Sequence, residues 1–311
     1  MAPALVASHR LKPLDGAVLV LVAFVWGFNF VVIAVGLDSF PPLLFSALRF
    51  LICAFPAVLI LPRPNIPWRD LIALGIVLGT LLFGFLFVGI HVGVPPGLAS
   101  LLMQTQVFFT LILSVALLGE RPRALNWAAL AVGFGGIALI ASEQTRAGSG
   151  LALVLVLSGA LSWGVANVMI KRLPRVNMLH LMVWISLVPP IPLVALSLVV
   201  DGPGTIAAAL AGFDLSGMAA VLYTGLVSTI LAYGIWGRML QRYPTAVVTP
   251  FALLVPIFGL GSAVIALGER YTERDIAAGI LVLSALALNT LAARRPRPVA
   301  APSVDAAEAG R

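Results

Sequence analysis

Long apolar runs, separated by short polar connections, follow one another along almost the whole chain. A helix rises ~1.5 Å per residue, so about 20 apolar residues are enough to cross the hydrocarbon core of a bilayer. The first run is too long and too rich in bulky side chains for a cleaved signal peptide, and it is counted as a span. The pattern predicts ten membrane-spanning helices, over residues 14–36, 41–61, 71–90, 96–118, 125–142, 151–170, 178–199, 216–237, 246–267 and 275–292.

The composition indicates an all-α polytopic membrane protein and excludes several other classes. Of the 311 residues, 61% are hydrophobic and 10% are charged, whereas a soluble domain carries about 25% charged residues. The net charge of +7 comes from arginines scattered at span ends, where they anchor helices in the lipid bilayer, so no nucleic-acid partner is expected. The single cysteine, Cys53, cannot form an intrachain disulfide and belongs to no cluster of metal ligands.

Basic residues are distributed unevenly between the two sets of connections. Alternate connections, starting with the N-terminal segment, hold 15 of the 19 lysines and arginines, and the other five connections hold 3. Short cytoplasmic loops are enriched in these residues, so both termini are expected in the cytoplasm, which requires an even number of spans. Residues 296–311 have no apolar run and are expected to form a disordered cytoplasmic tail.

An internal repeat relates the two halves of the chain. Residues 95–121 align without gaps to residues 244–270, and both stretches end in an identical Leu-Gly-Glu-Arg block. A second match joins Trp26-Gly27 to Trp163-Gly164, each in the span that opens its half. A four-residue identity that contains two charged residues is not expected by chance in apolar sequence, so we interpret the match as a duplication.

The duplication predicts two five-helix repeats, over residues 14–142 and 151–292. Five is an odd number, so the second repeat enters the membrane from the opposite side and is inverted relative to the first. Inverted repeats are typical of secondary transporters, whose substrate site lies near the membrane midplane between the repeats. A duplicated membrane scaffold without transport activity is the alternative interpretation.

Several stretches carry a family likeness. They are WGFNFVVIAVGL from residue 26, PPLLFSALRF at 41–50, PPGLASLLMQTQVFFT at 95–110 and the two Leu-Gly-Glu-Arg blocks. These stretches resemble the EamA family of the drug/metabolite transporter superfamily. Within it, the chain is most similar to bacterial O-acetylserine/cysteine exporters, through Ser162-Trp163-Gly164 with Asn167, LVSTILAYGIW at 226–236 and LLVP at 253–256.

The resemblance implies a bacterial inner-membrane protein that exports a small amino-acid-like substrate without a cofactor, a metal or ATP hydrolysis. It points first to O-acetylserine and cysteine, with other amino acids or drugs as the alternative. An intramembrane enzyme is excluded because no HExxH, G-x-S-x-G or paired-aspartate motif is found, so no catalytic residue is assigned. Every acidic residue lies at or beyond a span end, which gives little support to proton antiport and leaves facilitated efflux open. The sequence also leaves a homo-oligomer open.

Arg49 lies about eight residues into the second predicted span, roughly 12 Å below the end of that span. A charge at such depth costs at least ~2.5–3.5 kcal/mol on insertion scales, and it normally faces the protein interior with a partner. One candidate partner is the carboxylate of an amino-acid substrate. The alternative is a structural arginine, bonded to helix-end carbonyls or packed so that it fixes the bundle.

Three amides within spans, Asn29, Gln104 and Asn167, are further candidates for the substrate site. A buried amide must find hydrogen bonds in a bilayer, either with a small zwitterion or with a neighbouring helix, and the sequence favours neither. Gln106 is interpreted as a contact between helices. On a continuous helix it lies about 200° around the axis from Gln104, so the two cannot both face one cavity.

Five aromatic residues are candidates to line the cavity, Tyr223 among them. Trp26 and Trp163 lie too deep in their spans for the aromatic belt at the membrane surface. Trp163 and Asn167 are four residues apart and share a helix face, and Tyr233 and Trp236, three residues apart, share another.

Two pairs of residues are candidates for hinges and gates. Pro250 and Pro256 lie within the ninth predicted span, where each removes a backbone hydrogen bond and kinks the helix, although rigid bundles are kinked as well. Glu120 and Glu269 lie at helix C-terminal ends, where the helix dipole disfavours a carboxylate. Each is expected to pair with the adjacent arginine or with a donor on a neighbouring helix, and a gate contact is the alternative.

Overall fold

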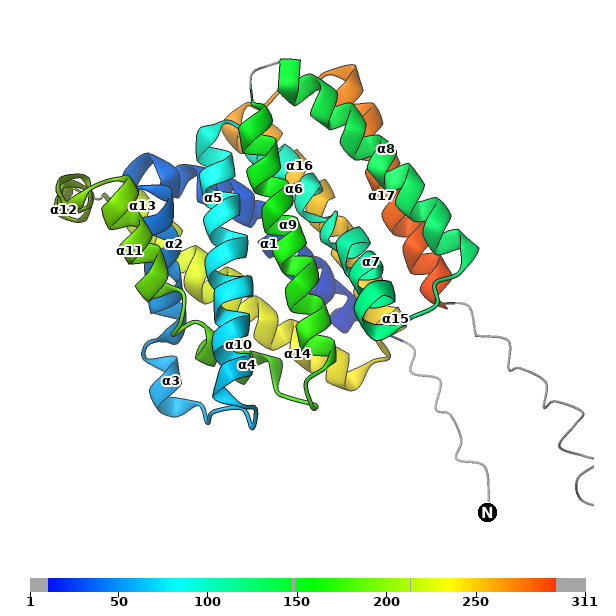
Figure 1. The fold of residues 1–311 in the computed structure, drawn as a ribbon, viewed down its shortest axis with the longest axis horizontal. Helices are drawn as coiled ribbons and strands as arrows, with labels where there is room; N and C mark the ends of the chain where they lie inside the picture. Colours follow the sequence, from blue (N-terminus) through cyan, green and yellow to red (C-terminus); the bar gives the residue numbers. More distant parts are fainter. Residues whose placement is uncertain (1–10, 147–148, 213, 295–311) are drawn as a thin grey trace, which may run out of the picture.

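The computed structural model, which describes residues 11–146, 149–212 and 214–294, contains ten apolar helical spans within those residues (Figure 1). Each predicted span has a counterpart within a few residues, which confirms the all-α polytopic fold. The predicted tail at 296–311 lies outside the described residues. The first five spans comprise α1 (Pro13–Ser39), α2 (Pro42–Ala54), α3 (Ala57–Ile60), α4 (Trp68–Leu74), η1 (Gly75–Leu81), α5 (Leu82–Val92), α6 (Pro96–Met103), α7 (Gln106–Leu118) and α8 (Ala124–Arg146).

The last five spans repeat this order, with one unpredicted element in the connection between the seventh and eighth spans. That element, α12, has ten residues, and at ~1.5 Å per residue it is too short to cross the bilayer. The elements are α9 (Gly150–Lys171), α10 (Met178–Ile185), α11 (Pro190–Val200), α12 (Pro203–Gly212), α13 (Leu215–Leu222), η2 (Tyr223–Leu231), α14 (Ala232–Arg242), α15 (Thr245–Val248), η3 (Thr249–Leu253), α16 (Leu254–Leu267) and α17 (Glu273–Arg294).

The third and eighth spans each contain a π-helical stretch, η1 and η2, at equivalent positions of the two repeats. The stretches start at Gly75 and Tyr223, 148 residues apart, and end at Leu81 and Leu231, 150 residues apart. These offsets bracket the 149 residues that separate the aligned stretches in the sequence, since 95 pairs with 244. π-Helical turns are rare and often mark functional sites, so their recurrence supports both the duplication and a functional role for these spans.

The repeated Leu-Gly-Glu-Arg block ends a helix in the same way in both repeats. Gly119 and Gly268 adopt the left-handed conformation, with φ of 66° and 68°, which costs glycine no steric energy. The next N–H then bonds back to the last turn, from Glu120 to the Ser114 carbonyl at 3.2 Å and from Glu269 to the Ala263 carbonyl at 3.3 Å. A left-handed glycine is a common helix terminator, and this shared geometry gives the repeated glycine a structural reason.

The first helix of each repeat packs against the fourth span of the other repeat. In α1, a Cβ atom added to Gly27 would lie 2.6 Å from the Cβ of Phe258 in α16. In α9, a Cβ atom added to Gly164 would lie 2.8 Å from the Cβ of Phe109 in α7. Both tryptophan–glycine pairs and both phenylalanines are matched by the repeat. The two halves are therefore interlocked by equivalent contacts, as inverted repeats require.

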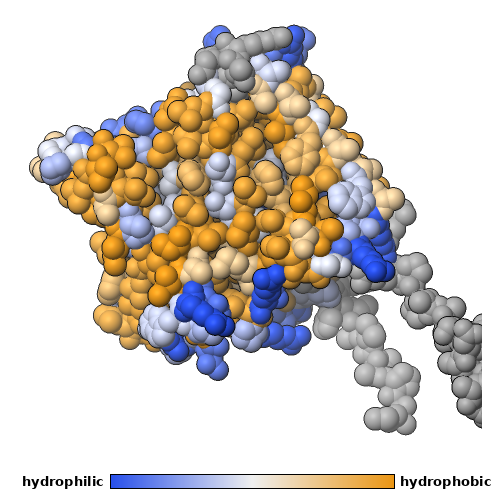
Figure 2. Space-filling view, viewed as in Figure 1, coloured by the Kyte–Doolittle hydropathy of each residue, from blue (hydrophilic) through white to orange (hydrophobic). Residues whose placement is uncertain are grey.

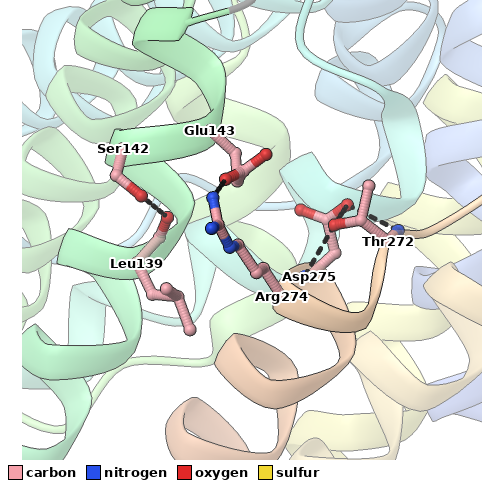
Figure 3. A network of polar contacts seen from close by, with 6 residues as sticks. All are labelled: Leu139, Ser142, Glu143, Thr272, Arg274 and Asp275. Atoms are coloured by element: carbon pink, nitrogen blue, oxygen red, sulfur yellow. Dashed lines mark hydrogen bonds and ion pairs between the residues drawn. The ribbon is translucent and has the colours of Figure 1, made fainter.

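The fifth helices of the two repeats, α8 and α17, pack side by side along their length (Figure 1). Gly136 permits the close approach, because a Cβ atom there would lie 2.8 Å from the Cγ2 of Val282. At one end, Asn126 Nδ2 donates to Asn289 Oδ1 at 2.9 Å. At the other end, Arg274 forms an ion pair with Glu143, beside the capped start of α17 (Figure 3). Side-chain contacts thus join α8 and α17 near both membrane faces.

The outer surface of the bundle matches a lipid environment. Figure 2 shows hydrophobic side chains across the middle of the molecule and hydrophilic ones along its upper and lower edges. Val199 and Ile265 are 83% and 87% exposed, which water would penalise and hydrocarbon does not. The surface therefore supports ten spans in a bilayer rather than a bundle in water.

We expect Gly27→Ala to destabilise the contact between the repeats. The added methyl would meet Phe258 Cβ at 2.6 Å and two backbone atoms, the Val255 oxygen at 2.7 Å and the Gly259 nitrogen at 2.8 Å, none of which can rotate away. Overpacking of this kind costs about 1–3 kcal/mol. Thermal unfolding of the purified protein measures it, with Gly135→Ala as the control because an added Cβ there would meet no atom of a neighbouring element within 4 Å. Equal midpoints for the two variants would contradict the packing described here.

Candidate substrate site

The fourth and ninth spans are both interrupted, and a side chain joins the two interruptions. In the fourth span, α6 ends at Met103 and α7 begins at Gln106. In the ninth span, η3 leads into α16, whose third residue, Pro256, has no N–H to donate to the carbonyl of Ala252. Gln104 supplies the missing donor, because its Nε2 lies 3.0 Å from the Ala252 oxygen. Each repeat thus contributes one broken span to the same junction.

A cavity of about 270 Å³ lies beside this junction, between the fourth span, α14, η3 and α17. Asn289 and Thr290 of α17 lie near the end of that helix, so the cavity occupies the half of the bundle nearer the face where both ends of the described chain lie. Within the described residues its lining carries no charge. The polar lining residues are Gln104, Gln106, Thr249, Asn289 and Thr290, and the largest apolar one is Trp236.

The sequence prediction that Gln104 and Gln106 cannot face one cavity is wrong. Both line it, because the chain does not continue as an α-helix through residues 104 and 105. The N–H groups of Gln104 and Thr105 bond to carbonyls three residues back, at 3.1 and 3.0 Å. Such 3₁₀ bonds turn the chain by about 120° per residue instead of about 100°, which brings the two side chains closer to one side.

Asn167 reaches the cavity wall through Gln106. Its Nδ2 donates to Gln106 Oε1 at 2.6 Å and to Thr110 Oγ1 at 3.1 Å, so it holds the cavity-lining amide in place from α9. Trp163, which the sequence placed on the same helix face, packs against the hydrophobic core and is not among the residues that line the cavity. Of the two α9 candidates, only Asn167 is therefore joined to the cavity lining among the described residues.

Trp26, Tyr233 and Trp236 form an aromatic cluster between α1 and α14. The Trp26 ring lies 5.2 Å from the Tyr233 ring and 5.1 Å from the Trp236 ring. Trp26 Nε1 donates to the Ser228 carbonyl in η2 at 2.9 Å, so the π-helical stretch fixes the orientation of the indole. Because Trp236 also lines the cavity, this aromatic cluster forms one of its walls.

Arg49 of α2 is 2% exposed, and most of its hydrogen-bonding capacity is unused. Its Nη2 donates to Thr229 Oγ1 in η2 at 2.8 Å, and its guanidinium lies 3.8 Å from the centre of the Phe83 ring. Nε and Nη1 are buried and have no hydrogen-bond partner among the described residues. A buried cation with two free donors is suited to an incoming carboxylate.

Two further candidates lie away from the cavity lining. Asn29 in α1 is 6% exposed, and its Oδ1 has no hydrogen-bond partner in the described part of the chain. Pro250 lies in the first turn of η3, so it begins a 3₁₀ turn and does not kink an α-helix as predicted. The sequence reasoning missed Thr249, Asn289 and Thr290. Polar side chains inside spans were the available signal for all three.

Glu120 and Glu269 follow the last turns of α7 and α16, which end at opposite faces of the bundle (Figure 1), and both take donors from neighbouring elements. Glu120 pairs with Lys171 at the end of α9, at 3.2 Å, and both side chains are 44% exposed. Such exposed pairs contribute little stability.

Glu269 is bound more extensively. It accepts from the Gly97 N–H at the start of α6 at 3.2 Å and from the Tyr271 hydroxyl at 2.6 Å. Burial and the bond to Glu269 raise the pKa of Tyr271, so that hydroxyl remains a donor. Glu269 thereby ties α6 to the end of α16 at the face opposite the cavity.

Ten spans, two interlocked inverted repeats and a cavity where a broken span from each repeat meets define a secondary-transporter architecture. The chain belongs to the EamA-like transporter family, which matches residues 16–142 and again residues 150–291. This membership places the protein among transporters and not among enzymes.

Similar proteins agree with this assignment. The chain is 38% identical to the "Probable amino-acid metabolite efflux pump" of Escherichia coli over 90% of its length and 96% of that protein. It is 40% identical to the protein of the same description from Salmonella typhimurium, with the same coverage. A solved crystal structure with 20% identity has the same fold, with a TM-score of 0.58 over 91% of this chain and 99% of that chain.

Proposed function

We propose that this protein exports small amino-acid metabolites across the bacterial inner membrane by alternating access. The observation that carries the proposal is the uncharged polar cavity at the junction of the two broken spans. Neutral amides and hydroxyls bind a small zwitterion without imposing a net charge, and the cavity volume of about 270 Å³ suits a solute of that size. The printed descriptions of the two bacterial relatives support the same class of substrate.

The positions of the cavity and of Glu269 support a state open toward one face. The cavity lies toward the face where both ends of the described chain lie, and Glu269 closes the opposite face onto α6. The uneven distribution of lysine and arginine supports a cytoplasmic location for the first face. The proposed cycle begins with substrate entry from the cytoplasm and requires the contact between Glu269 and Gly97 to open for release.

Within this class, we infer that substrates with a free carboxylate and a short polar side chain are favoured, with O-acetylserine and cysteine first. Arg49 supports a carboxylate partner, because two of its buried donors are free and no acidic residue among those described pairs with it. The aromatic cluster reaches the cavity through Trp236, which is one of the lining residues. In the proposed cycle the carboxylate passes the cluster and reaches Arg49 as the two repeats rock.

Uptake into inside-out membrane vesicles tests the function. We expect vesicles that contain the protein to accumulate labelled O-acetylserine and cysteine faster than vesicles without it. Cells that overproduce the protein should secrete both compounds and tolerate more of them. Uptake of apolar cationic drugs without uptake of any amino acid would overturn the proposal, and uptake of other amino acids alone would overturn only its finer substrate assignment.

A further inference from the structure

A second cavity, separate from the substrate site, lies at the membrane face where the chain's described ends lie. It has a volume of about 300 Å³ and is formed by two connections, the one between the second and third spans and the one between the sixth and seventh. Its apolar walls are formed by Pro64, Pro174 and Val176. Its polar lining consists of Arg63, Asn65, Arg175, Asn177 and His180. We call these five residues the arginine pocket.

The arginine pocket carries positive charge that nothing in the described structure neutralises. None of its lining residues is acidic. Asp70, the nearest carboxylate along the chain, pairs with Arg69 at 3.6 Å. Within the described residues, Arg175 has no hydrogen bond or ion pair, and Arg63 stacks on the Trp68 ring with 4.7 Å between guanidinium and ring centre. Two guanidinium groups converge here without a protein anion.

Amide donors complement the two guanidinium groups. The Asn177 Oδ1 accepts from the backbone N–H groups of Leu179 and His180, at 2.9 and 3.4 Å. Its oxygen is therefore occupied, and its Nδ2 group is left to donate. Two arginines and an oriented amide donor are the groups that bind phosphate oxygens, because each guanidinium offers a planar pair of N–H donors.

Two tryptophans place the pocket at the depth of lipid headgroups. Trp68 is 52% exposed, and its ring lies 6.1 Å from that of Trp184. Trp184 Nε1 donates to the Leu61 carbonyl at 3.0 Å, which anchors the connection that carries Arg63. Tryptophans with an apolar body and a hydrogen-bonded indole are typical of the membrane–water interface.

We propose that the arginine pocket binds the phosphate group of an anionic phospholipid. The lipid chains would lie along the apolar outer surface beside it, and the headgroup would bridge the two connections. This site is independent of the substrate site, since the two cavities share no lining residue. The bound headgroup would fix the start of α10 relative to the connection before α4.

Native mass spectrometry of the purified full-length protein tests the proposal. We expect phosphatidylglycerol to bind more tightly than zwitterionic phosphatidylcholine. Each of Arg63→Gln and Arg175→Gln should weaken phosphatidylglycerol binding about fivefold, and the double variant about 25-fold. Arg69→Gln is the matched control, because it removes one charge from the same face outside the pocket, at a side chain that is 85% exposed. It should change binding less than twofold.

The other results would overturn the proposal. Equal weakening by all three single variants would show diffuse attraction to the basic face and no pocket. Equal binding of the two lipids by the unaltered protein would exclude recognition of an anionic headgroup. A separate arm uses inorganic phosphate and glycerol phosphate. Tight binding of these soluble phosphates, abolished in the double variant while lipid binding is unchanged, would assign the pocket to a soluble phosphate compound. Thermal unfolding of each variant confirms that it is folded.

Discussion

Export of O-acetylserine should fall about tenfold in Arg49→Lys and about 100-fold in Arg49→Gln. Lysine keeps the charge but lacks the planar fork that can bind a carboxylate through two N–H groups, and glutamine removes the charge. A hydrogen bond to a charged group contributes about 1.5–3 kcal/mol, which corresponds to roughly 10- to 150-fold in kcat/KM. The measurement is initial uptake into inside-out vesicles, normalised to the amount of folded protein.

Two comparisons separate a substrate role of Arg49 from a structural one. Thr229→Val removes the partner of Nη2 but leaves Nε and Nη1 unchanged, so most of the transport should remain. Serine methyl ester has no carboxylate, so any uptake of it should be nearly the same in the unaltered protein and in Arg49→Lys. Two results would show that Arg49 does not bind the carboxylate through two bonds. The first is a loss of transport in Thr229→Val as large as that in Arg49→Gln. The second is normal transport by Arg49→Lys at a normal level of protein in the membrane.

Gln104→Met should destabilise the protein by about 1–3 kcal/mol and abolish most transport. Methionine has a similar length but cannot donate to the Ala252 carbonyl, to which Pro256 cannot donate a helical N–H either. A carbonyl left without its side-chain donor inside a membrane span costs about that much free energy. Thermal unfolding followed by tryptophan fluorescence measures the stability, and vesicle uptake measures the transport.

The double variant Gln104→Met/Pro256→Ala makes this prediction specific. Alanine at position 256 restores a backbone N–H four residues after Ala252, so the carbonyl regains a donor within α16. We expect most of the lost stability to return. Transport should stay low, because the ninth span is then a more regular helix and the junction between the repeats is gone. Full recovery of both properties would show that the junction has no role in transport.

The spans and the repeat could be predicted from the sequence because each has a strong physical cause. A bilayer requires about 20 consecutive apolar residues wherever the chain crosses it, so the pattern locates crossings such as 14–36 and 96–118 directly. The repeated glycine of the Leu-Gly-Glu-Arg blocks ends a helix in the left-handed conformation, and only glycine does so without strain. Local rules of this kind act within one stretch of sequence.

The geometry of the candidate site could not be predicted, because it depends on contacts between the repeats. No proline or glycine marks the interruption at residues 104 and 105, and the partner of Gln104 is a carbonyl 148 residues away to which Pro256 cannot donate. The convergence of Gln104 and Gln106 on one cavity follows from that interruption. The arginine pocket likewise joins two distant connections, and its residues carry no motif.

The seam between α8 and α17 limits how the bundle can move. These helices end their respective repeats, and they are fastened by Asn126 with Asn289 near one face and by Glu143 with Arg274 near the other, with Gly136 against Val282 between them. Opening a gap there would break every one of these contacts at once. In the proposed transport cycle we therefore expect this seam to stay closed while the other eight spans move, and any lateral opening into the lipid to form elsewhere around the bundle.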